Sequence, residues 1–103
     1  MQKGEKMLYS LTEKLKFDTN PQIEIKGETI TVKSDAETVL KLMDILKTKG
    51  ELDASIASVE LLFSKDDQKK IKKLNLQFGD YITLLEVAVS LALGEDPEKE
   101  SGE

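Results

Sequence analysis

The chain has 103 residues, 34% charged and 39% hydrophobic, which is typical of one small globular domain. All 15 basic residues are lysines, and 20 acidic residues outnumber them, so the net charge is −5. The absence of His and Cys excludes Ser-His-Asp and thiol catalysis, disulfides and zinc–thiolate sites. Without arginine, the usual reader of guanine and phosphate, an acidic chain is not expected to bind nucleic acid.

The N-terminal segment, residues 1–20, predicts an arm or a short helix. Leu8, Leu11 and Leu15 recur at helical spacing, which favours an amphipathic helix over 5–16. The alternative is an arm without fixed structure whose leucines dock only in an assembly. The turn-forming residues of 18–21 separate this segment from the next predicted element.

Residues 22–33 predict a β-hairpin. The β-branched residues that alternate with polar ones are Ile23, Ile25, Ile30 and Val32. Gly27-Glu28 favours a type II′ turn, which needs a positive φ at its first central residue. This register pairs Ile25 with Ile30 and gathers the apolar side chains on one face. A lone hairpin is marginal in water, so we expect helices to cover that face.

The next segment, 35–48, predicts an amphipathic helix. Ser34 followed by Glu37 forms a capping-box pattern at its start, and Gly50 is suited to follow its end. The residues expected on its core-facing side are Val39, Leu42, Met43 and Leu46.

Two further helices are expected before the last one. Asp53 is the expected cap of a helix over 54–63, and Ser64 that of a helix over 65–75. The second carries four clustered lysines: Lys69, Lys70, Lys72 and Lys73. We interpret them as a solvated face rather than an anion site, because the chain is acidic and lacks arginine.

The last helix, expected over Tyr81–Leu93 between an Asp80 cap and a closing Gly94, is apolar nearly all round. Its clearly polar residues, Thr83, Glu86 and Ser90, form one narrow stripe. Such a helix is either the axis of the core or partly open to a partner. The residues we predict to bind a partner are Ile82, Val87, Val89, Leu91 and Leu93 on this helix, with Leu8, Leu11 and Leu15 of the N-terminal segment.

Together these elements predict an α+β fold. We expect a single domain over 1–94, comprising the segment 1–20, the hairpin 22–33 and three to four helices within 35–94. The tail 95–103 has five acids and one lysine, so we expect disorder. No catalytic, cofactor or metal motif is present, which makes an enzyme an unfavoured interpretation. No signal-peptide pattern opens the chain, and its longest apolar run is too short to span a bilayer, so we expect a cytoplasmic protein without membrane attachment.

The order of these elements resembles a known family. The hairpin, the runs VLKLMDILK and VELLF, and a last helix ending in LALGED before an acidic tail are similar to small tail assembly chaperones of long-tailed bacteriophages and prophages of Gram-positive bacteria. The resemblance covers residues 22–96 and rests on pattern and element order.

The resemblance implies a non-enzymatic function in the host bacterial cytoplasm. Members of the family bind the tape measure protein, keep its hydrophobic helices soluble, help recruit tail tube subunits and are absent from the mature virion. Many also make a longer product by ribosomal frameshifting near the end of the reading frame. The residues themselves leave open whether the last helix serves self-association or such a partner. The alternative function is a small acidic regulator, such as an inhibitor or antitoxin, that binds one protein target.

Overall fold

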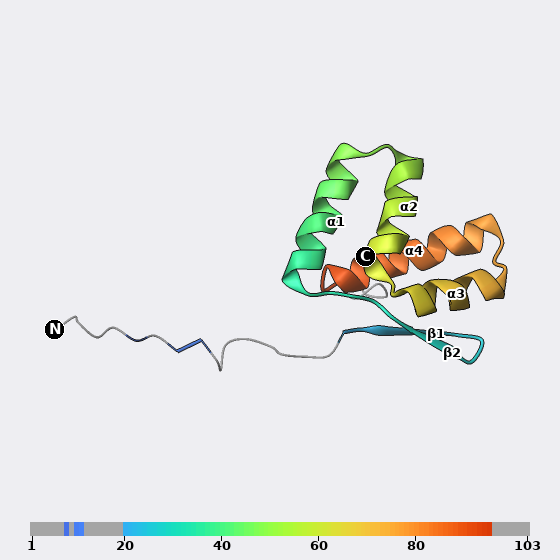
Figure 1. Cartoon of the computed structure of the whole chain (residues 1–103), viewed down its shortest axis with the longest axis horizontal. Coiled ribbons are helices and arrows are strands. Elements are labelled where there is room, and N and C mark those ends of the chain that lie inside the picture. The colour runs from blue at the N-terminus through green and yellow to red at the C-terminus, as the bar shows by residue number, and fades with distance from the viewer. Residues whose placement is uncertain (1–7, 9, 12–19, 96–103) are drawn as a thin grey trace, which may run out of the picture.

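The computed structural model describes Leu8, Ser10, Leu11 and residues 20–95, and it confirms the α+β class. The predicted helix 5–16, Leu15 and the tail beyond Glu95 lie outside the described residues. The described elements are β1 (Gln22–Ile25), β2 (Glu28–Thr31), α1 (Ala36–Thr48), α2 (Glu51–Leu62), α3 (Lys65–Leu74) and α4 (Phe78–Ala92). In Figure 1, α1 and α2 stand side by side, α4 runs across them, and α3 lies above the hairpin.

The hairpin has a different register from the predicted one. Ile23 pairs with Ile30, and the turn is Lys26-Gly27, with φ of +49° and +85°. Two positive φ values correspond to a type I′ turn, which matches the twist of the strands. The predicted Ile25–Ile30 pairing and Gly27-Glu28 turn are therefore wrong. The shift is two residues, so every side chain keeps its predicted face.

The start of α1 also differs from the prediction. Asp35, rather than Ser34, is the N-cap: its carboxylate accepts hydrogen bonds from the Thr38 N–H at 3.2 Å and the Thr38 hydroxyl at 2.7 Å. Ser34 instead donates from its N–H and hydroxyl to Asn20 Oδ1, both at 3.1 Å. The capping box with Glu37 is wrong because Ser34 serves to tie the chain entering the hairpin to the chain leaving it.

The other helix ends are partly as predicted. Ser64 caps α3, with its hydroxyl accepting from the Asp67 N–H at 3.1 Å. Helices α2 and α4 begin before their expected caps, so Asp53 and Asp80 lie in first turns, where their charge still suits the helix dipole. Gly94, at φ +83°, closes α4 as predicted, because its N–H and that of Glu95 bond to carbonyls of the last turn.

The core lies where the hairpin, α2 and α4 meet. The large side chains with almost no exposure are Ile30, Val32, Leu42, Leu62 and Phe63. Helix α4 contributes Leu84, Leu85, Ala88 and Ala92, and its backbone lies closest to α2. The last helix is thus a core element, whereas Tyr81 in its first half is only half-buried.

Candidate protein-binding surface

Helix α1 carries an exposed apolar row, which we call the α1 row: Leu40, Met43 and Leu46. Their side chains are 65%, 51% and 46% exposed. Met43 and Leu46 were expected to face the core, and this expectation is wrong. Thr38 and Leu42 are the buried residues of α1 instead, and the α1 row lies on another side of the helix, where it stays exposed.

The α1 row exists because α1 has more apolar residues than its neighbours can cover. Its main packing partner is α2, on one side. Burying one Leu or Met is worth about 1.5–3 kcal/mol, so three exposed side chains in a row form an adhesive surface. The sequence signal for this row was the breadth of the apolar face, which exceeds a single core-facing stripe.

A second apolar surface lies between the N-terminal halves of α2 and α4, which we call the α2–α4 groove. It is a hollow of about 530 Å³ whose most exposed apolar residues are Leu52 and Phe78, at 70% and 75%. Tyr81 lies within it, and partial burial raises the pKa of its phenol. The charged residues that line it are Glu51 on α2 and Glu86 on α4. The groove is therefore lined mainly by apolar side chains, with one carboxylate from each helix.

The structure separates the residues predicted to bind a partner. Val89, Leu91 and Leu93 are half-buried and pack against the core. Ile82 lines the α2–α4 groove, and Val87 lines a different hollow, beside the hairpin. Leu8 and Leu11 are exposed, and Leu15 lies outside the described residues. The α4 residues thus do not form one continuous surface, and their role in binding stays a prediction.

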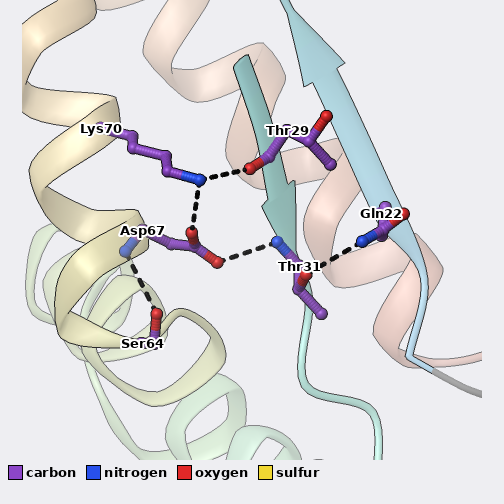
Figure 2. Close-up of polar contacts among 6 residues, drawn as sticks. All are labelled: Gln22, Thr29, Thr31, Ser64, Asp67 and Lys70. Carbon is purple, nitrogen blue, oxygen red and sulfur yellow. Dashed lines mark hydrogen bonds and ion pairs between the residues drawn. The ribbon is translucent and has the colours of Figure 1, made fainter.

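A polar junction joins α3 to the hairpin, and Figure 2 shows it. The Thr31 N–H donates to Asp67 Oδ2 at 2.9 Å, and Lys70 Nζ donates to the Thr29 carbonyl at 2.9 Å. Lys70 also lies 3.5 Å from Asp67 Oδ1. These side chains satisfy main-chain groups on the edge of β2 that β1 does not pair. We name this set the α3–β2 junction.

The junction changes the interpretation of the lysine cluster. Lys70 is engaged with β2, while Lys69, Lys72 and Lys73 are exposed on α3. The sequence pattern gave no sign that Asp67 and Lys70 would meet a strand some forty residues earlier in the chain. The cluster is therefore partly structural.

The described part of the chain carries neither a metal-binding cluster nor a membrane-spanning helix. No group of three or more acidic residues there could hold a metal ion. Among the same residues, no helix combines the length and the apolar character that crossing a bilayer requires. No family model, curated protein or solved structure matches the chain.

Proposed function

We propose that this chain is a non-enzymatic tail assembly chaperone of a long-tailed bacteriophage. In this role it binds the tape measure protein, keeps its apolar helices soluble and helps recruit tail tube subunits in the host cytoplasm. The resemblance of residues 22–96 to that family suggests the role. The observation that carries it is the α1 row, an exposed line of Leu and Met on a helix.

The chemistry of the α1 row suits an apolar helix as partner. Leu40, Met43 and Leu46 lie at three-residue intervals, so they follow one side of α1 and can pack against a second helix. Methionine adapts its shape to different apolar surfaces, which helps a chaperone bind many turns of a long, varied helix. The surrounding charged residues of the acidic chain keep the unbound protein dispersed.

The alternative, a small acidic regulator, gains no specific support from the geometry. An antitoxin would need a basic surface. Helix α3 carries the clustered lysines, and its Lys70 is engaged with Asp67 and the Thr29 carbonyl. The regulator therefore remains only as an alternative outcome of the experiments that follow.

Co-expression tests the proposal directly. We expect this chain to raise the soluble fraction of the tape measure protein from the same genome. Leu40→Asp should abolish that effect while leaving this chain folded, because Leu40 is exposed. The matched control is Lys41→Asp, which places the same residue at the neighbouring exposed position without removing an apolar side chain. A tape measure protein equally insoluble with and without this chain would refute the proposal.

The nucleotide sequence offers a second test. A slippery run near codons 94–103, followed by a long open frame in the −1 or +1 register, would support a tail assembly chaperone. Its absence would leave co-expression as the deciding experiment, since the longer product is common in the family rather than universal.

A further inference from the structure

The α2–α4 groove has a different chemistry from the α1 row, and its occupant can be argued from the chain itself. The groove is concave, about 530 Å³, and lined by apolar side chains from both helices. Glu51 on one wall and Glu86 on the other are its charged lining residues. It is therefore suited to an apolar stripe flanked by positive charges.

Two segments of this chain lie mostly outside the described residues, and only one has the required chemistry. Residues 96–103 contain no large apolar side chain and carry four acids against one lysine, so they would be repelled. Residues 1–17 carry Leu8, Leu11 and Leu15 at helical spacing, with four lysines against two glutamates. Lys14 and Lys16 flank Leu15, one on each side of the predicted apolar stripe.

Geometry favours a segment from a second copy. The chain enters the hairpin at Asn20, which bonds to Ser34, and the adjacent Lys33 N–H donates to the carbonyl of Leu62 at the far end of α2. From Leu62 to Leu52, at the groove, α2 spans about 15 Å. The five residue steps from Asn20 back to Leu15 span at most about 17 Å when fully extended. These two lengths are nearly equal, so docking within one copy would require the chain between Leu15 and Asn20 to be almost fully extended. In the single chain, Leu8 and Leu11 are in fact exposed.

We infer that the α2–α4 groove binds the N-terminal segment, residues 5–16, of a second copy of this chain. Leu8, Leu11 and Leu15 contact its apolar lining, and Lys14 and Lys16 pair with Glu51 and Glu86. A reciprocal exchange, in which each copy donates its segment to the other, closes a two-fold dimer. This inference is independent of the proposed function, because it uses a different surface.

Cross-linking tests the inference, since the chain has no cysteine of its own. One copy carries Leu11→Cys and the other Ile56→Cys, on the α2 wall of the groove. After oxidation of the mixture, we expect a disulfide between the two copies, identified by peptide mapping. The control replaces Ile56→Cys by Leu40→Cys, on the α1 row. A yield no higher than the control would overturn the inference. A double variant Leu11→Cys/Ile56→Cys that cross-links only within one copy would also overturn it, in favour of docking within a chain.

Sedimentation of the full chain provides the second readout. We expect a dimer that Leu11→Asp weakens at least tenfold, and this residue precedes the hairpin and the helices, so unfolding would not explain the loss. Glu86→Lys should weaken the dimer, and combining it with Lys14→Glu should restore it. Leu40→Asp should leave the dimer intact while abolishing the effect on the tape measure protein. A strictly monomeric wild-type chain would refute the inference without touching the proposed function.

Discussion

The α3–β2 junction and the α1 row are opposite cases on the same small domain. Polar groups have hydrogen-bond partners at the junction, whereas apolar side chains are exposed on the α1 row. At the junction, Asp67 and Lys70 satisfy main-chain groups at one edge of the hairpin, so no further strand is needed there. On the α1 row, Leu40 and Met43 remain in water although they could be buried. The comparison teaches that this chain uses polar side chains to complete the hairpin edge and leaves apolar side chains of α1 exposed.

Among the polar contacts, the largest effect should come from breaking the junction. Asp67→Ala removes the acceptor of the partly buried Thr31 N–H and the partner of Lys70. An unsatisfied buried donor costs about 1–3 kcal/mol, so we expect a loss of that size in the free energy of unfolding, measured by urea denaturation. Asp66→Ala, at the exposed neighbouring residue, is the control. Equal effects of the two substitutions would show that the junction does not stabilise the hairpin.

The next effect concerns the cap that holds α3 against the strand. Ser64→Ala removes the side-chain acceptor of the Asp67 N–H and should cost about 1 kcal/mol. Ser34→Ala, which the sequence pattern alone predicts to cost as much, should cost only a few tenths, because the Ser34 N–H keeps its bond to Asn20. Denaturation midpoints in the reverse order would contradict the assignment of the caps.

A smaller effect is expected at the start of α1, and it depends on pH. Hydrogen bonds from the Thr38 hydroxyl and N–H hold the pKa of Asp35 below its ordinary value. A carboxyl with a lowered pKa in the folded state stabilises the fold above its unfolded pKa, and that contribution is lost as pH falls through the folded pKa. Asp35→Ala should therefore destabilise the chain at pH 7, and this effect should shrink as the pH falls below 3.8, the ordinary pKa of Asp, and through the lower pKa of the folded state. A difference between the two proteins that is constant from about pH 7 to about pH 2.5 would rule out the charged cap.

The smallest effect on stability should come from the α1 row itself. Leu40→Asp replaces an exposed side chain, and exposed substitutions usually change the free energy of unfolding by no more than about 0.5 kcal/mol. Leu42→Asp, two residues along the same helix, is buried and should unfold the protein. If both variants unfold, the α1 row belongs to the core and cannot be a binding surface.

Local patterns predicted much of the fold. The period-2 alternation found the hairpin and its inner face, and the capping signal at Ser64 and the terminal Gly94 were correct. The errors arose where two local solutions differ little in energy. A two-residue register shift leaves every side chain on the same face of the hairpin. Ser34 and Asp35 are adjacent and both suit a cap, so tertiary hydrogen bonds such as Ser34 to Asn20 decide which of them caps α1.

The exposed apolar surfaces were harder to predict because exposure is a property of the assembled domain. Met43 and Leu46 have the same local pattern as core residues, and they stay outside because no described element covers that side of α1. Likewise, Leu52 and Phe78 meet only when α2 and α4 come together. The sequence indicated surplus apolar surface on α4, whereas among the helices the structure places the most exposed large apolar residues on α1, α2 and the first turn of α4.

Hydrogen exchange with a bound partner tests most directly the proposal that the α1 row binds the tape measure protein. The probe is a purified helical segment of the tape measure protein, added to the full chain and followed by mass spectrometry of backbone amides. We predict slower exchange in α1 around the α1 row, with amides of β2 and α3 unchanged, because the junction is already satisfied in the free protein. Slower exchange in β2 and α3 without any change in α1 would contradict the account.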